Sequence, residues 1–116
     1  MGVENNEAVL ATTSDEKSLS KAKQWISELS ECHQSLFAFI PAIVNGKETI
    51  VLAPDGSKKG WSTANEIAEL RNRFVEFLSA DGVWFNWVEV GYGEYGQSIL
   101  RGNNSNCHND KEYAAS

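Results

Sequence analysis

The sequence predicts an α+β fold of two layers, in which two helices cover one face of a mixed sheet of three or four strands. Two segments carry apolar residues at the spacing of an amphipathic helix, and three others are short apolar runs rich in β-branched and aromatic residues. Their order is α-β-β-α-β, followed by a possible fourth strand. The 116 residues suffice for one domain. We place it at residues 14–100, between a flexible arm (1–13) and a disordered tail (101–116).

Both helices are predicted from apolar periodicity and from capping signals. The first spans about 15–33, where Thr13 and Glu16 fit the cap and third position of a capping box. The second spans about 63–80, with Thr63 and Glu66 in the same roles, and Gly82 suits the left-handed position behind a helix. The stripes that should face the sheet are Leu19, Ala22, Ile26 and Leu29 in the first helix and Ile67, Leu70, Phe74, Phe77 and Leu78 in the second.

A hairpin is predicted for the two apolar runs on either side of Asn45-Gly46. This dipeptide favours a two-residue turn, because both residues tolerate positive φ. The turn would pair Val44 with Lys47, Ala42 with Thr49 and Ile40 with Val51. Pro41 then falls at a position without a ladder hydrogen bond, so its strand should lie at a sheet edge. We therefore expect the strands to lie side by side in chain order.

The segment 83–92 reads as the third strand, and the glycines that follow it have two interpretations. Gly91, Gly93 and Gly96 have the Gly-x-Gly-x-x-Gly spacing of a dinucleotide-binding loop. In such a site the glycines follow the first strand and open a helix. Here they come near the end of the sequence, with too few residues behind them for that helix. The spacing is therefore interpreted as a glycine-rich hairpin connection.

The predicted sheet is apolar on both faces. Strands 36–44 and 47–53 place Phe37, Phe39, Ile43, Ile50 and Leu52 on one face and Leu36, Ile40, Val44, Val51 and Ala53 on the other. Two helices can cover only one of these faces. Either the second face associates with another copy or a protein partner, or the terminal segments fold over it.

Composition excludes several classes of function. The formal net charge of −6 disfavours binding to a phosphate backbone, and it suits either solubility or association with a basic partner. No apolar run approaches the roughly 20 residues of a membrane span, and the first residues lack the basic region of a secretion signal. We expect a cytoplasmic protein with no membrane and no nucleic-acid partner.

Two sets of residues could in principle form a metal site or a catalytic pair, but their positions in the sequence disfavour both roles. Cys32-His33 and Cys107-His108 could together supply four zinc ligands, but neighbouring positions diverge by about 100° on a helix, and the second pair falls in the predicted tail. Glu89 and Glu94 are interpreted as surface carboxylates rather than an acid–base pair. The sequence therefore predicts no catalytic residue, no metal site and no cofactor.

The leading hypothesis is a small non-enzymatic interaction module that acts through a sheet face or an acidic surface. Its candidate interaction residues are Lys58, Lys59, Trp61, Trp84, Trp87, Tyr92 and Tyr95. One alternative is an accessory or inhibitor protein of a phage or mobile element, such as an anti-defence protein, which should show a contiguous acidic patch. The other is a homodimeric enzyme or ligand-binding domain with an interface site, which should show a cleft lined by Trp84, Trp87 and a buried carboxylate.

Overall fold

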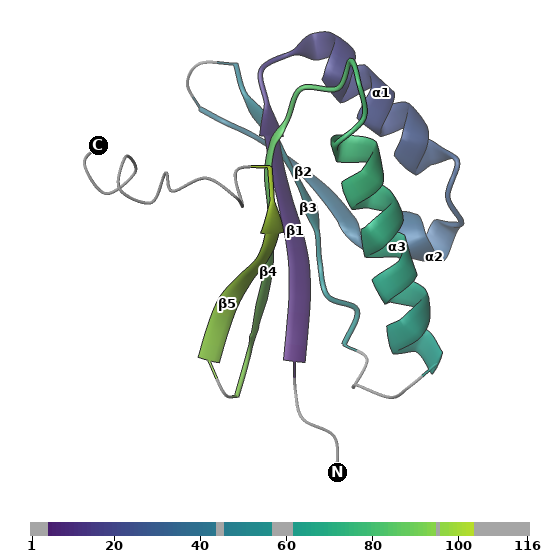
Figure 1. Cartoon of the computed structure of the whole chain (residues 1–116). Helices are drawn as coiled ribbons and strands as arrows, with labels where there is room; N and C mark the ends of the chain where they lie inside the picture. The colour runs from purple at the N-terminus through teal and green to yellow at the C-terminus, as the bar shows by residue number, and fades with distance from the viewer. Residues whose placement is uncertain (1–4, 44–45, 57–61, 95, 104–116) are drawn as a thin grey trace, which may run out of the picture.

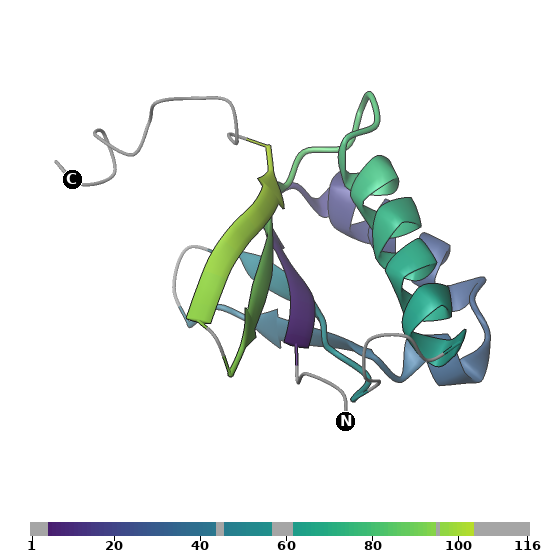
Figure 2. The ribbon, with the colours of Figure 1, turned by 60° about the horizontal axis from the view of Figure 1, so that its bottom comes forward.

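The computed structural model describes residues 5–43, 46–56, 62–94 and 96–103, and it contains one five-stranded sheet with all helices against one face (Figures 1 and 2). The elements are β1 (Asn5–Thr13), α1 (Glu16–Ser27), α2 (Glu31–Gln34), β2 (Phe37–Pro41), β3 (Glu48–Leu52), α3 (Ser62–Leu78), β4 (Asn86–Gly93) and β5 (Gly96–Gly102). The predicted α+β class and single helical layer agree with this arrangement.

The strand order is β2-β3-β1-β4-β5, and every neighbouring pair is antiparallel. Each long helix connects two strands that lie on either side of a third, which is the split β-α-β arrangement of ferredoxin-like topologies, extended here by β5. The predicted sheet of three or four mixed strands in chain order was therefore wrong. A strand from the beginning of the chain separates β3 from β4.

That inserted strand is β1, which the sequence analysis assigned to a flexible arm. Residues 5–13 instead form the central strand, paired with β3 on one side and β4 on the other. Its inward side chains Val9 and Ala11 are fully buried. Small residues such as Ala11 let helices approach the middle of the sheet, but they weaken the apolar alternation by which a strand is recognised. Residues 1–4 and 104–116, the rest of the predicted arm and most of the tail, lie outside the described part of the chain.

The first predicted helix is two helices in the structure. Asp15, not Thr13, is the cap of α1 and accepts a hydrogen bond from the backbone N–H of Ser18. The Ser18 hydroxyl also donates to this carboxylate, which lowers the pKa of Asp15. The helix ends at Ser27, and Ser30 caps the short α2. The side-chain amide of Gln34 donates to the carbonyls of Ser27 and Leu29, so the end of α1 is satisfied without a glycine.

Ser18 ties α1 to the segment that leads into β4. Its hydroxyl is fully buried, accepts from the backbone N–H of Trp84 at 2.8 Å and donates to Asp15 at 2.6 Å. Ser18→Ala removes both bonds and is expected to lower the free energy of unfolding by about 1–3 kcal/mol. Urea unfolding followed by tryptophan fluorescence measures this loss. Ser20→Ala is the matched control, because Ser20 is exposed on the same helix, and an equal loss in both variants would contradict the prediction.

The β2–β3 hairpin has a longer connection than predicted. The backbone N–H of Ala42 donates to the carbonyl of Lys47, and Ile40 pairs with Thr49 instead of Val51. A shift of the partner by two residues leaves every side chain on its expected face. Gly46 has a φ of 60°, although Val44 and Asn45 are outside the described residues. The edge position of the Pro41 strand is confirmed, since β2 is outermost in the sheet.

The core lies between the helices and the inner face of the sheet. α3 begins at Ser62, one residue before the predicted cap, and its buried residues include four of the five in the predicted stripe, while Phe77 is partly buried. Phe74 is at the centre, with its ring centroid 5.2 Å from that of Phe37 and 5.5 Å from that of Trp25. Aromatic residues from α1, α3 and β2 thus join the two layers.

The glycine-rich segment is a hairpin connection, as predicted. Gly93 pairs with Gly96 across the β4–β5 turn, and Gly96 has a φ of 116°. Gly91 lies under the side chain of Leu100, because a Cβ built at this glycine would stand 3.3 Å from a Leu100 methyl group. These glycines therefore form a turn and a close packing contact within a β-hairpin, and no helix follows them among the described residues.

Candidate functional site

The candidate site is the face of the sheet that points away from the helices, here called the open face. Its positions follow from strand register and alternation, and they are Asn6, Ala8, Leu10, Thr12, Ala38, Ile40, Thr49, Val51, Asn86, Val88, Val90, Tyr92, Gln97 and Ile99. The helices lie on the opposite side of the sheet (Figure 2). Large side chains consequently remain exposed, including Leu10 in the central strand at 39% and Ile99 at 71%.

Apolar residues on the open face form continuous rows across the strands. Ala38, Val51, Leu10 and Val88 are successive cross-strand partners from β2 to β4. A second row joins Ala8, Val90 and Ile99 from β1 to β5. Cross-strand partners lie about 5 Å apart, so each row is a band of contacting side chains. The two rows together make one apolar band across the middle of the sheet.

Uncharged polar side chains border this apolar band. Thr12, Thr49 and Asn86 lie on one side of it, and the two threonine hydroxyls are 2.8 Å apart. Asn6 and Gln97 lie on the other side, as the partners of Tyr92. None of the open-face positions is Asp, Glu, Lys or Arg, although the chain has 26 such residues. The charged residues among the described ones therefore lie outside these strand positions, and Lys47 is next to them, in a depression that Thr12 and Asn86 also line.

Of the three candidate interaction residues that the structure describes, one belongs to the open face. Tyr92 is on it and is 43% exposed, whereas Trp87 is buried in the core. Trp84 is 71% exposed, but it precedes β4 and lies outside the paired strands. Lys58, Lys59, Trp61 and Tyr95 lie outside the described residues. Sequence reasoning omitted the face's central residues, Leu10 and Ala8, because it did not recognise β1.

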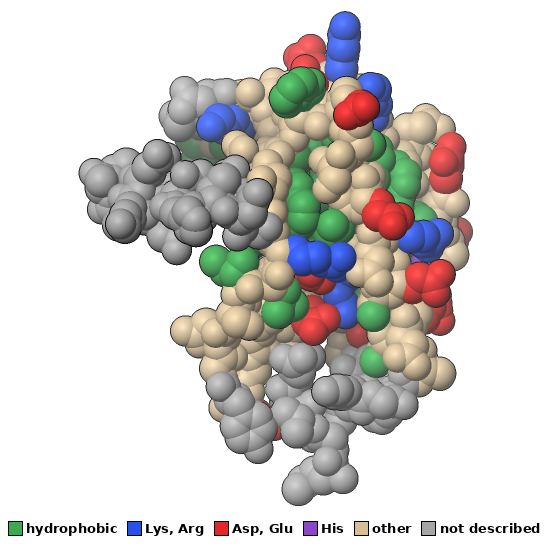
Figure 3. All heavy atoms as spheres, viewed as in Figure 1, with side chains coloured by type: hydrophobic (Ala, Val, Ile, Leu, Met, Phe, Trp, Pro, Cys, Tyr) green, Lys and Arg blue, Asp and Glu red, His purple; other side chains and the backbone are tan. Residues whose placement is uncertain are grey.

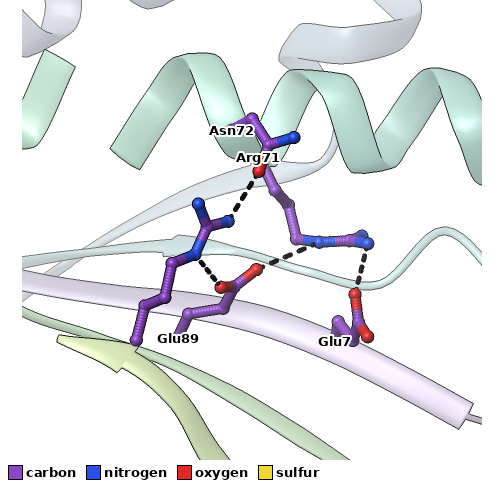
Figure 4. Close-up of polar contacts among 5 residues, drawn as sticks. Glu7, Arg71, Asn72 and Glu89 are labelled. Carbon is purple, nitrogen blue, oxygen red and sulfur yellow. Dashed lines mark hydrogen bonds and ion pairs between the residues drawn. The ribbon is translucent and has the colours of Figure 1, made fainter. Parts of the chain in front are cut away.

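A second candidate is a partly buried cluster of charges between β4 and α3 (Figure 4). The side chain of Glu89 is only 5% exposed, and its two oxygens contact Arg101 Nε at 2.5 Å and Arg71 Nε at 3.5 Å. Arg71 also pairs with Glu7 of β1. Arg101 reaches from β5 to the side-chain oxygen of Asn72 at 2.8 Å. The cluster links β1, β4, β5 and α3.

This ionic cluster is better suited to holding the layers together than to catalysis. Both oxygens of Glu89 face guanidinium groups, and the hydrogen bond from Arg101 raises the pKa of that arginine. Glu89 is thus not the surface carboxylate that the sequence suggested. The surface depression beside Trp84, of about 400 Å³, is lined by neither Glu89 nor Trp87. This depression is therefore not the cleft lined by Trp84, Trp87 and a buried carboxylate that the enzyme alternative expects.

The helical side of the described surface is chemically mixed. A depression of about 550 Å³ between α1 and α3 is lined by Trp25, Glu28, Leu29, Arg73, Glu76 and Phe77, which mixes both signs of charge with apolar groups. In the view of Figure 3, acidic and basic side chains are interspersed over the helical layer. This view consequently offers no contiguous acidic patch of the kind expected of an inhibitor that mimics a polyanion.

The cysteine–histidine pairs are not brought into a metal site by the described residues. Cys32 is exposed, and His33 Nε2 lies 2.7 Å from a carboxylate oxygen of Glu66 on α3. Within the described ranges no group of three or more His, Cys, Asp or Glu side chains is arranged to hold an ion. Cys107 and His108 lie beyond those ranges.

Comparison of the chain with models of known families, with curated proteins and with solved structures found no significant match. Among the described residues, none of the helices has both the length and the apolar character needed to cross a bilayer.

Proposed function

We propose that this chain is a protein-interaction module whose open face binds the surface of another protein molecule. The observation that carries the proposal is a sheet face with an apolar middle, uncharged borders and exposed Leu10, Ile40, Tyr92 and Ile99. Large contiguous apolar patches on soluble proteins commonly mark interaction sites. An apolar centre within a polar border is also the usual anatomy of a protein–protein interface.

Folding alone does not account for the composition of this face. An antiparallel sheet with one solvated face normally alternates apolar residues inward with polar residues outward. Here Leu10 and Val88 are paired outward in the two central strands, while the core already has Val9, Ala11 and Trp87 inward. Polar outward residues would leave that core unchanged. The presence of apolar residues at these outward positions is explained if a partner covers the face.

The face is better suited to a protein than to a nucleic acid. A phosphate backbone is bound through Lys and Arg, and none of these lies at an open-face position. Binding of bases by stacking uses several aromatic side chains, and Tyr92 is the single aromatic residue among those positions. Protein surfaces provide the apolar side chains that complement this band.

Site-specific photo-crosslinking in cells that express the full chain tests the proposal. The photo-reactive residue p-benzoylphenylalanine would replace Ile99, which is exposed on the open face, or Glu69, which is exposed on α3. We expect irradiation to produce an intermolecular protein adduct from position 99 and none from position 69. Mass spectrometry would identify the joined peptides.

The comparison between the two positions decides the outcome. Equal adducts from positions 69 and 99 would show non-selective encounters and contradict a specific open-face site. An adduct from position 99 to residues 104–116 of the same chain would show that the face is covered internally, and it would overturn the proposal.

A further inference from the structure

We infer that the partner of the open face is a second copy of this chain, bound face to face about a two-fold axis. This inference rests on the proposed function and names its partner. In a two-fold interface the same surface patch is used by both molecules, so the patch must complement itself. The charge, hydrogen-bonding chemistry and size of the open face satisfy that condition.

Charge provides the first argument. The chain carries a formal net charge of −6, so two copies repel each other at most orientations. The strand positions of the open face carry no charged residue, although Lys47 lies beside Thr12 and Asn86, so contact there keeps most charges of the two copies apart. A partner with a basic surface would bury its Lys and Arg residues without a counter-charge. An uncharged surface is required, and a second copy presents one.

Hydrogen-bonding chemistry provides the second argument. The polar residues bordering the apolar band carry hydroxyl and amide groups, and each such group can both donate and accept a hydrogen bond. Asn86 and Gln97 can therefore pair with the same residue types across a two-fold axis. A carboxylate or an ammonium group at those positions would meet its own kind and repel. The polar border of the open face is thus self-complementary, as the apolar band at its centre is.

The size of the face provides the third argument. Four inter-strand spacings of about 4.8 Å and strands of five to nine residues give a face on the order of 20 by 20 Å. Two such faces in contact would bury on the order of 1,000 Å², which is at the lower end of specific interfaces. Packed sheets stand about 10 Å apart, a distance that the exposed Leu10, Ile40 and Ile99 side chains can fill.

The segment 104–116 is poorly suited by composition to cover the same face. Its thirteen residues, NSNCHNDKEYAAS, contain one large apolar side chain, Tyr113, together with three charged residues. Burial of apolar area is what stabilises a cover over an apolar face. A second open face offers several large apolar side chains for the same purpose, so self-association is the better-matched arrangement.

Sedimentation velocity of the purified full chain between about 1 and 100 µM tests the inference. We expect a concentration-dependent dimer for the unmodified chain. Ile99→Glu at one edge of the face and Ile40→Glu at the other should each weaken dimerisation at least tenfold, because each places an unpaired charge from both copies in an apolar interface. Both residues are more than half exposed, so the fold should tolerate the change. Ile43→Glu is the matched control, since Ile43 is fully exposed outside the paired strands.

The outcomes separate this inference from the proposed function. A dimer that is weakened at positions 40 and 99 but not at 43 supports the inference. A strict monomer up to 100 µM, or a dimer that none of the three changes affects, overturns it. In those cases a heterologous adduct from position 99 in the crosslinking experiment would still support the proposed function. The absence of any intermolecular adduct there would overturn both.

Discussion

Replacing Glu89 by alanine is expected to lower the free energy of unfolding by about 3–5 kcal/mol. This is a large part of the roughly 5–15 kcal/mol by which a domain of this size is stable. Glu89 accepts a hydrogen bond from Arg101 and forms an ion pair with Arg71, and its side chain is 5% exposed. Its removal leaves Arg71, whose side chain is 11% exposed, with Glu7 as its remaining ion-pair partner. A buried guanidinium group without sufficient negative charge is the cause of the expected loss.

Removing the charges together should have a different effect. In a variant with methionine in place of Glu89, Arg71 and Arg101, no buried charge remains uncompensated, and we expect stability within about 1 kcal/mol of the unmodified chain or above it. Glu7 is tolerable alone because its side chain is 29% exposed to water. The single and triple variants thus separate the cost of a broken ion pair from the net contribution of the cluster.

Urea unfolding at neutral pH measures these differences, at one fixed protein concentration because association would add to apparent stability. Glu69→Ala on the exposed side of α3 is the control for loss of a negative charge, and a change within about 0.5 kcal/mol is expected for it. A loss of less than 1 kcal/mol for Glu89→Ala would contradict the structural role assigned to the cluster.

The sequence pattern around Glu89 and Arg71 indicates that both residues border the core, although Glu89 was interpreted as a surface carboxylate. Residues 85, 87 and 89 alternate onto one face of the strand, so Glu89 shares that face with Phe85 and Trp87, which are both buried. On α3, Arg71 follows Leu70 directly and precedes Phe74 by three, so it borders the apolar stripe. A carboxylate on one apolar face and a guanidinium beside another predict a buried pair. The sequence could not show that these faces meet, because their contact depends on the sheet order.

The sheet order was unpredictable from the hairpin alone. Hydrophobic pattern and turn chemistry identified β2, β3, β4 and α3, and the edge position of β2 followed from Pro41. β1 was missed because its inward residues Ala11 and Thr13 are small or polar. β1 is stabilised by hydrogen bonds to a strand on each side. This pairing cannot be predicted from residues 5–13 alone. The same omission hid the middle of the open face.

The assignment of β2 and β3 side chains to the two faces of the sheet, in contrast, was predicted correctly from the sequence. Ile40 and Val51 were placed on the face opposite to Phe37 and Ile50, and the structure confirms this even though the pairing register was wrong. Side-chain direction in a strand depends on odd or even position, and a register error of two residues preserves it. An excess apolar face could therefore be predicted, but its charge-free extent across five strands required the sheet order.

The aromatic centre of the core gives the second large expected effect. Phe74→Ala should lower the free energy of unfolding by about 3–5 kcal/mol, because the ring is fully buried and its loss leaves a cavity that neighbouring side chains fill only in part. Phe74 packs against Trp25 from α1 and Phe37 from β2. The substitution therefore removes the ring contacts of α3 with α1 and with β2, while the contact between Trp25 and Phe37 remains.

Phe77→Ala is the informative control for this prediction. Phe77 stacks on Trp25 at 5.6 Å and on Phe74 at 6.5 Å, but it is only partly buried and water can occupy part of the space it leaves. We expect a loss clearly smaller than that of Phe74→Ala in the same urea titration. Equal losses would show that the two rings contribute alike, and that the core is not centred on Phe74. A larger loss at Phe74 would support a core centred on this ring, which packs on both α1 and β2 on the side of the sheet opposite the face proposed to bind a second copy.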